Sequence, residues 1–416
     1  MNNSETTSVR RPLKRVKQLT SHKHLSRDVS RLPLRSTTGR LDAIIVPASR
    51  PASFLQPAID LGASLGVTLV VLCSKQARLE QVAKRVASTP GSKCLIIPIS
   101  AGWRHSNFPS RTTHSDFRDA QAGRESDLSL KRNLGLLLAR LRGWNKIAFV
   151  DDDIKVSRTD NIARLAGQLN CHQVAGMVLD DYPDNSVVCH ARRLAGMSQD
   201  VFVTGAVLGV HCNSLPLSFF PDIYNEDWFF FAEEAATRRL PRVGTAKQEQ
   251  YNPFATPDRA RREEFGDLLA EGLYALFGET DTSMTFDEQL GGATKVYWER
   301  FIQARRDVLA ETRTALVRLA NQDPDNGGIS SAYYALGAAE SQLDTVKPDL
   351  CLNFLEAWRA DLSEWQRLSS GVNNVGSVLQ AMDFLELKAW RMAEFGAERV
   401  ELPDGSARRL TNLAGV

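Results

Sequence analysis

Short apolar runs alternate with helical segments through the first part of this chain, and this alternation limits the fold more than any other feature. Residues 41–47, 68–73 and 94–99 are rich in Val, Ile, Leu and Cys. Residues 52–65 and 75–88, which lie between them, have helical spacing. Strands that alternate with helices of this length form mostly parallel sheets with helices on both faces. We therefore expect an α/β fold.

A further apolar run, residues 146–150, ends in three consecutive carboxylates, Asp151, Asp152 and Asp153. The preceding residues, 127–142, have leucines at helical spacing. Aspartate costs free energy in a packed interior unless a cation, a proton or a hydrogen-bond donor compensates it. Open α/β sheets bind ligands at the carboxyl ends of their strands, where Asp-x-Asp can hold a divalent cation against phosphates. The alternative is a solvated turn or the cap of the next helix.

A second acidic pair, Glu226 and Asp227, stands directly before Trp228 and three phenylalanines. A partly desolvated carboxylate has a raised pKa and is a better base. Aromatic rings can also pack against the apolar face of a sugar. The alternative is the start of a helix, with Asn225 as its cap and the acids in the first turn. The two interpretations are compatible, because a base at a helix start is well positioned.

A polar turn follows the first predicted strand, and it consists of Pro47, Ala48, Ser49, Arg50 and Pro51. Such a turn can contact a nucleotide through its backbone and through Ser49, with Arg50 near phosphate. An ordinary strand-to-helix turn is an equally good interpretation. Lys131 and Arg132, near the start of the helix at 127–142, either neutralise a diphosphate or are solvated helix residues.

Together these segments resemble an inverting glycosyltransferase of the GT-A fold, similar to glycosyltransferase family two. The resemblance covers residues 41–260, and its segments occur in the family's order. They are the turn Pro47-Ala48-Ser49-Arg50, the helix motif Lys131-Arg132-Asn133-Leu134-Gly135, the block Phe149-Val150-Asp151-Asp152-Asp153 and the later Asn225-Glu226-Asp227-Trp228. The resemblance implies a GT-A-like, Rossmann-type mixed sheet flanked by helices.

The resemblance also implies a donor site for a nucleoside-diphosphate sugar, UDP- or GDP-linked. Asp151 or Asp152 would contact ribose or diphosphate, and Asp151 with Asp153 would ligate Mn²⁺ or Mg²⁺. This pair forms only if Asp152 faces away. The turn at Pro47, Ala48, Ser49 and Arg50 would contact the donor. Arg132 would lie near it, and Gly205 would permit close approach of the backbone to donor or acceptor.

For the reaction, the resemblance implies that Asp227, with Glu226 beside it, is the catalytic carboxylate. Asp227 would deprotonate an acceptor hydroxyl of unknown type, and attack from the opposite face would invert the anomeric carbon. Retaining relatives often use a late histidine as a metal ligand, and no histidine follows His211. This favours inversion by a metal-dependent glycosyltransferase.

Three other classes fit the sequence less well. A sugar nucleotidylyltransferase would have a glycine-rich loop after the first strand, which residues 47–51 lack. A phosphatase with an Asp nucleophile would have Thr or Val where Lys155 stands. A non-catalytic binding or scaffold protein, with a degenerate nucleotide site and a basic tail that binds polyanions, remains the alternative.

The two ends of the chain differ from the predicted catalytic domain at 41–260. Residues 1–40 contain ten Lys or Arg and two acids, although the whole chain has a net charge of +2. We expect a disordered basic tail there, either nonspecific or in contact with a membrane surface or a polyanion. Residues 240–258 are loop-like, and residues 261–416 predict an all-helical C-terminal region whose last helix covers 375–395.

Membrane insertion and an oxidising compartment are not expected. No run of about 18 apolar residues occurs, which is the length that a spanning helix needs. The six cysteines are scattered without a CxxC motif or a zinc spacing. We expect a protein of the reducing cytoplasm.

Overall fold

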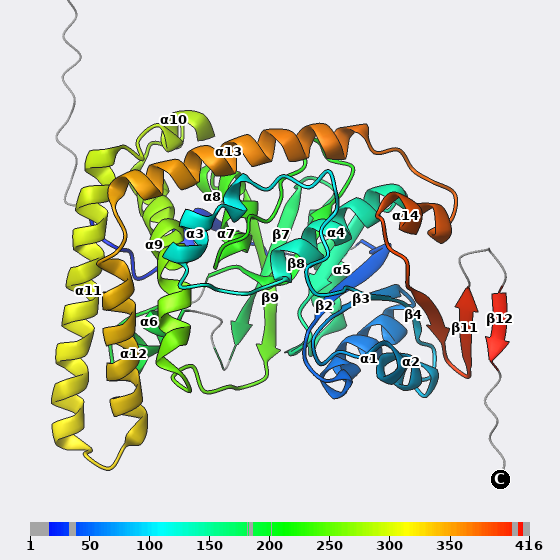
Figure 1. The fold of residues 1–416 in the computed structure, drawn as a ribbon, viewed down its shortest axis with the longest axis horizontal. Helices are drawn as coiled ribbons and strands as arrows, with labels where there is room; N and C mark the ends of the chain where they lie inside the picture. Colours follow the sequence, from blue (N-terminus) through cyan, green and yellow to red (C-terminus); the bar gives the residue numbers. More distant parts are fainter. Residues whose placement is uncertain are drawn as a thin grey trace, which may run out of the picture.

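The computed structural model describes residues 16–32, 39–180, 182, 186–200, 202–401 and 407–410. They form one mixed sheet of twelve strands in the order β1-β9-β7-β8-β5-β2-β3-β4-β10-β11-β12, with β6 paired to β9. Helices cover the sheet, and the C-terminal helices form a layer at its side and top (Figure 1). The predicted α/β class, with a mixed sheet flanked by helices, is confirmed.

The parallel part of the sheet follows the predicted apolar runs. Strand β2 pairs in parallel with β3 and β5, and β3 pairs with β4. These strands are Ala43–Ala48 (β2), Thr68–Cys73 (β3), Lys93–Pro98 (β4) and Lys146–Val150 (β5). Ile44 belongs to the core that contains α1 (Gln56–Leu65) and α2 (Leu79–Ala87), whereas Ile45 belongs to the core under α4 (Leu128–Leu141). Both faces of the strands are therefore buried, as their continuous apolar sequences predict.

An antiparallel strand brings a second part of the chain to the end of β5. Strand β8 (Thr204–His211) runs antiparallel to both β5 and β7 (Val174–Asp180). Strand β9 (Leu240–Gln248) is parallel to β7. The predicted loop at 240–258 is therefore wrong for its first nine residues, where sheet pairing prevails over the local Gly and Gln content. The start of β8 lies beside the end of β5.

The N-terminal segment is more ordered than predicted. Residues 23–25 form the 3-10 helix η1, and β1 (Ser26–Asp28) pairs in parallel with β9. His22 and Leu25 are buried. The predicted disordered tail is therefore wrong for residues 16–32, because a few apolar anchors and an open strand edge are enough to fix a polar segment. Residues 1–15 and 33–38 lie outside the described residues.

The C-terminal region is helical as predicted, except at its end. The helices are α9 (Pro257–Glu279), α10 (Phe286–Leu290), α11 (Lys295–Gln322), α12 (Gly327–Leu343), α13 (Pro348–Gly371) and α14 (Val378–Phe384). The predicted helix at 375–395 ends early, because β10 (Arg391–Glu394) pairs with the edge of β4. Strands β11 (Ala397–Glu401) and β12 (Ala407–Leu410) continue the sheet. An all-helical C-terminal region is therefore wrong for residues 391–401 and 407–410.

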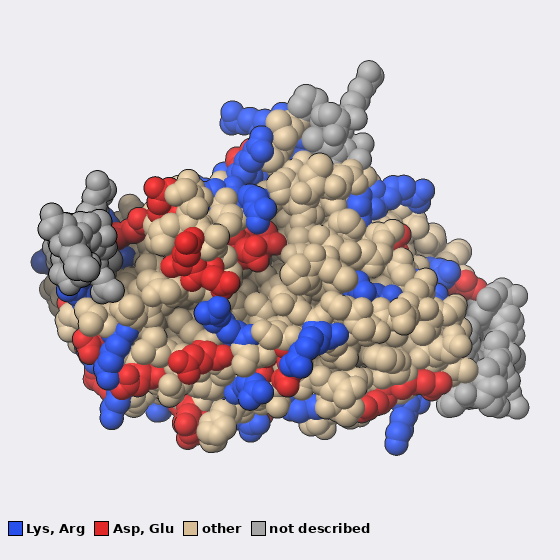
Figure 2. Space-filling model, turned by 90° about the horizontal axis from the view of Figure 1, so that it is seen from above, with Lys and Arg blue, Asp and Glu red and all other residues tan. Residues whose placement is uncertain are grey.

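Helix α13 crosses the top of the molecule in Figure 1, and Figure 2 looks onto this side. Lys and Arg are interspersed with Asp and Glu over this face in Figure 2. No helix among the described residues has the length and apolar content that crossing a membrane requires. The remaining short elements are η3 (Ala52–Leu55), η4 (Arg111–Thr113), α3 (Ser115–Ala120), β6 (Ile154–Lys155), α5 (Thr159–Gln168), α6 (Val187–Leu194), α7 (Glu226–Phe230) and α8 (Ala232–Ala236).

Candidate functional site

The turn after β2 holds the carboxylate of Asp152. The backbone N–H groups of Ser49 and Arg50 donate to Asp152 Oδ2 at 2.7 and 2.9 Å. Pro47 and Ala48 are buried residues of β2 itself, and the Ala48 carbonyl accepts a hydrogen bond from Lys131 Nζ at 2.8 Å. The predicted turn and the predicted acidic cluster are thus brought together at the carboxyl end of the sheet, where α/β folds bind ligands.

A single guanidinium connects two of the three consecutive carboxylates. Arg50 Nη1 contacts Asp152 Oδ1, and Arg50 Nη2 lies 2.9 Å from Asp153 Oδ2. Asp153 Oδ2 also accepts a hydrogen bond from Gln248 Nε2 at 3.0 Å. The side chain of Arg50 is 42% exposed, whereas those of Asp152 and Asp153 are 2% and 4% exposed. Two nearly buried carboxylates therefore share one accessible cation.

The third carboxylate, Asp151, has a different partner. Arg132 Nη2 donates to both oxygens of Asp151 at 2.9 and 3.0 Å, and Arg132 Nη1 donates to Glu226 Oε1 at 2.7 Å. Arg132 is 2% exposed, and its guanidinium lies over the ring of Phe220 at 5.4 Å. Burial raises the pKa of Asp151 to about 7, although Arg132 opposes this shift. Arg132 thus connects the end of β5 to the start of α7.

The geometry differs from the predicted grouping in one respect. The sequence predicts that Asp151 and Asp153 form the metal-binding pair, provided that the Asp152 side chain points away from them. In the structure Asp152 shares Arg50 with Asp153, while Asp151 is held by Arg132. The side chains that lie together are therefore Asp152 and Asp153. Metal binding by any of the three stays a prediction.

Asp227 is the more accessible member of the second acidic pair. Its Oδ2 accepts a hydrogen bond from the Gly205 N–H at 2.6 Å, and its Oδ1 accepts one from the Trp228 N–H at 3.0 Å. Glu226 is only 4% exposed and faces Arg132. Asn225, just before α7, is in the left-handed conformation with φ of 63°. The turn therefore buries Glu226 and leaves Asp227 partly exposed, as a proton acceptor requires.

The aromatic residues after Asp227 do not form a surface for a sugar. Trp228 is 9% exposed, and the three phenylalanines that follow are almost completely buried. Phe230 stacks on Phe220 with ring centroids 4.1 Å apart, and Trp228 lies 4.3 Å from Tyr274. The interpretation of these rings as sugar contacts is therefore wrong. They are core residues that anchor α7, which explains their density after two acids.

Gly205 is needed for close packing inside the site. A Cβ atom at this position would lie 2.6 Å from Arg132 Nη1 and 2.6 Å from the Cβ of Asp227. Contacts this short force neighbouring groups to move. Gly205 is therefore packed against Arg132 and Asp227 within the chain, and its predicted approach to donor or acceptor stays a prediction.

We expect Gly205→Ala to lower the free energy of unfolding by about 1–3 kcal/mol, the usual cost of overpacking. Gly337→Ala is the matched control, because a Cβ there has only Arg313 Nη2 at 4.0 Å. That helical substitution should raise stability by about 0.5–1 kcal/mol. Urea denaturation of both variants measures the difference. Equal midpoints would contradict the packing of Gly205 described above.

The pair Asp152 and Asp153 alone would not complete the coordination of a divalent cation. Within the described residues, no three His, Cys, Asp or Glu side chains are grouped so that they could hold a metal. Magnesium in phosphate-transfer sites is usually held by one or two carboxylates together with substrate phosphates. Asp152 and Asp153 fit that arrangement, because one cationic group already lies between them.

Sequence reasoning missed the contacts that hold this site in place. Gln248 reaches Asp153 from β9, and Asp267 on α9 accepts a hydrogen bond from Asn225 Nδ2 at 3.1 Å. Both are distant in sequence from their partners. The sequence predicts that Lys131 either contacts a diphosphate or is solvated, but its side chain is 1% exposed and joins Ala48 to Ser74. No local pattern distinguishes these residues.

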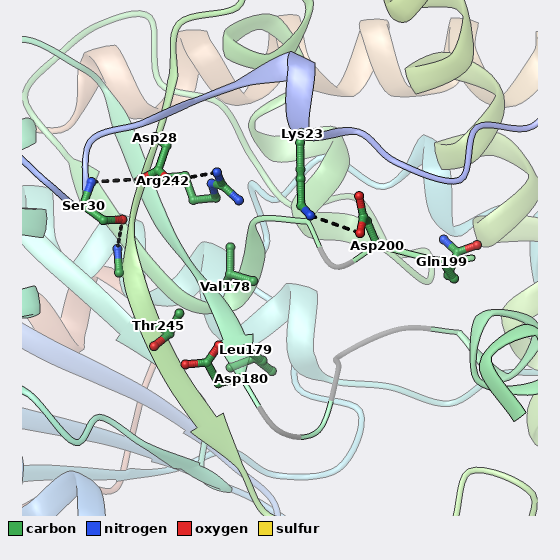
Figure 3. A pocket seen from close by; sticks show the side chains of 11 residues that line it. Lys23, Asp28, Ser30, Val178, Leu179, Asp180, Gln199, Asp200, Arg242 and Thr245 are labelled. Atoms are coloured by element: carbon green, nitrogen blue, oxygen red, sulfur yellow. Dashed lines mark hydrogen bonds and ion pairs between the residues drawn. The ribbon is translucent and has the colours of Figure 1, made fainter. Parts of the chain in front are cut away.

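A separate pocket of about 320 Å³ lies between the N-terminal segment and the strands β7 and β9 (Figure 3). Two ion pairs belong to its lining. Lys23 Nζ lies 3.0 Å from Asp200, and Arg242 Nη2 lies 3.0 Å from Asp28. None of the predicted site residues lines this pocket. It is therefore distinct from the carboxylates that follow β5 and those of α7.

No protein-family model matches this chain, and no curated protein matches it. Among solved structures, the chain is similar to the mannosyltransferase PcManGT from Pyrobaculum calidifontis in complex with GDP-Man and Mn²⁺, over 75% of this chain and 90% of that chain. The sequence identity is 14% and the TM-score is 0.41. At this TM-score the similarity supports no conclusion about function, so the assignment depends on the residues of the site.

Proposed function

We propose that the protein is a glycosyltransferase that moves a sugar from a nucleoside-diphosphate sugar, UDP- or GDP-linked, to an acceptor hydroxyl with inversion. The proposal rests on one observation: two separate acidic sites lie at the same end of the sheet. Asp152 and Asp153 share a cation after β5, and Asp227 lies on α7. Arg132 connects the two parts through Asp151 and Glu226.

In the proposed reaction Asp227 removes the proton from the acceptor hydroxyl. The acceptor oxygen forms a bond to the anomeric carbon, and the bond from that carbon to the diphosphate oxygen breaks with its electron pair. The N–H group of Gly205 orients the Asp227 carboxylate through Oδ2. Inversion requires that the base and the diphosphate act on opposite faces of the sugar, and the proposal assigns them to different elements, α7 and the segment after β5.

On the donor side, Asp152 and Asp153 would hold Mn²⁺ or Mg²⁺ together with the diphosphate, and Arg50 would contact phosphate oxygens. A bound divalent cation would neutralise the charge that develops on the leaving nucleoside diphosphate. Ser49 and Arg50 orient Asp152 through their backbone N–H groups, and Gln248 orients Asp153. This assignment replaces the pair Asp151 and Asp153 by Asp152 and Asp153.

The test is thermal unfolding with UDP, GDP and their sugar conjugates, with and without Mn²⁺. A ligand that binds only the folded protein raises the melting temperature, by an amount equivalent to about 2.7 kcal/mol at 100 times Kd. We expect a metal-dependent increase for one nucleotide. It should be lost in Asp153→Asn and kept in Asp383→Asn, since Asp383 is an exposed residue of α14.

The absence of an effect from every nucleotide would contradict the proposal. It would favour a non-catalytic binding protein, for which salt-sensitive binding of a polyanion is the expected observation.

A further inference from the structure

The guanidinium of Arg50 lies where a small cation between Asp152 and Asp153 would lie. It contacts Asp152 Oδ1 through Nη1 and lies 2.9 Å from Asp153 Oδ2 through Nη2. A nearly buried carboxylate needs a compensating charge or several donors. Arg50 supplies that charge to both carboxylates at once. A metal ion that approaches the free protein therefore meets two ligands that already share one positive charge.

We propose that Arg50 is a displaceable counter-cation of the Asp152–Asp153 pair, which excludes a divalent metal from the free protein and leaves the pair when a diphosphate binds. The part of the inference that concerns diphosphate rests on the proposed function. The exclusion of metal by Arg50 does not, because it depends only on contacts within the chain.

The surroundings of Arg50 allow its side chain to leave. It is 42% exposed and follows a strand in a loop, unlike Arg132, which is 2% exposed and held on both sides. A diphosphate offers the guanidinium new oxygens, and guanidinium binds phosphate through two parallel hydrogen bonds. The departing side chain would therefore exchange one anionic partner for another.

The two carboxylates keep their positions when the guanidinium leaves. Asp152 Oδ2 is held by two backbone N–H groups, those of Ser49 and Arg50, and neither depends on the Arg50 side chain. Asp153 Oδ2 keeps the hydrogen bond from Gln248. The pair would then be ready for a metal that arrives with the diphosphate. Metal and diphosphate are therefore expected to bind together, and metal alone is expected to bind weakly.

Binding of Mn²⁺ alone tests the role of Arg50 without any nucleotide. Electron paramagnetic resonance reports the free aqueous ion and gives the Kd for each variant. We expect Arg50→Met to bind Mn²⁺ about tenfold more tightly than the unmodified protein, or better, because a charge-assisted competitor has been removed. Arg300→Met, an exposed residue of α11, removes the same charge elsewhere and should change nothing. Adding Asp153→Asn to Arg50→Met should abolish the gain.

The second arm adds UDP or GDP to the unmodified protein in the same assay. We expect the nucleotide to make Mn²⁺ bind tightly. Equal Kd values for Mn²⁺ alone in the unmodified protein and Arg50→Met would overturn the inference about Arg50, whatever the nucleotide does. A gain in Arg50→Met without an effect from either nucleotide would overturn the diphosphate step and the proposed function, and would support only metal exclusion. Melting temperatures of all variants verify that they are folded.

Discussion

Replacing Asp227 by Asn is expected to lower the rate of sugar transfer by about 10²–10⁴-fold, the range that general-base catalysis contributes. The amide keeps an oxygen that can accept the hydrogen bond from the Gly205 N–H, which Asp227 Oδ2 now accepts at 2.6 Å. It cannot take a proton from the acceptor hydroxyl. The fold and the donor site should therefore survive while the chemical step is lost.

Glu226→Gln is the matched variant, because Glu226 is the adjacent carboxylate and the other candidate for the base. Glu226 is 4% exposed and pairs with Arg132 at 2.7 Å. Gln keeps an oxygen that can accept from Arg132, but it removes the negative charge beside this buried guanidinium. We expect a cost of about 1.5–3 kcal/mol in unfolding free energy, with a smaller effect on kcat. Melting with nucleotide and Mn²⁺, together with steady-state rates, separates the two variants. Activity of Asp227→Asn within about tenfold of the unmodified protein would exclude Asp227 as the base.

The sequence predicts well those parts of the fold that depend on local pattern. The continuous apolar runs predict the parallel strands, because both of their faces are buried and no alternation is needed. The cluster after residues 146–150 predicts polar groups at the carboxyl end of a strand. Gly205 is predicted from the resemblance as a point of close approach to donor or acceptor, whereas its packing against Arg132 and Asp227 is seen only in the structure. For the strands and the acidic cluster, the signal lies within a few residues of the feature.

Features that depend on residues distant in sequence cannot be predicted from local pattern. The strand at Arg391–Glu394 has only four residues, and it forms because β4 offers an unpaired edge. The rings after Asp227 are wrongly predicted as sugar contacts, because a run of aromatic residues has the same composition on a surface and in a core. Their burial is decided by Phe220 and by helices distant in sequence. The grouping of Asp152 with Asp153 is decided by Arg50, which precedes Asp152 by 102 residues in the chain.

The helical region is expected to be part of the site, because a buried ionic network joins it to the turn before Asp227. Arg305 on α11 is fully buried, donates to both oxygens of Glu264 at 2.9 Å and contacts Asp267 Oδ2 at 2.5 Å. Asp267 in turn accepts the hydrogen bond from Asn225 at 3.1 Å. The left-handed turn that presents Asp227 is therefore held from α9 and α11.

Arg305→Met should accordingly lower the free energy of unfolding by about 3–5 kcal/mol, the usual cost of leaving buried partner charges uncompensated. Arg306→Met is the control, since Arg306 is 38% exposed and its partner Asp344 is also exposed. Its effect should be within about 1 kcal/mol of zero. Urea denaturation at constant pH gives both values. Similar decreases in unfolding free energy in the two variants would show that the ionic network around Arg305 does not stabilise the fold.

The pH dependence of Arg305→Met provides an independent check with a definite sign. Burial raises the pKa of Glu264 to about 7 even with Arg305 beside it, and loss of that partner raises the pKa further. The unfolded state loses this proton at lower pH, so the stability falls as the pH rises from the unfolded value towards the folded one. The decrease in unfolding free energy caused by Arg305→Met should thus be smaller at pH 5.5 than at pH 8, because a protonated Glu264 needs no counter-charge. A loss that is independent of pH would mean that the substitution acts through packing, and the ionic link from the helical region to Asn225 would then have to be abandoned.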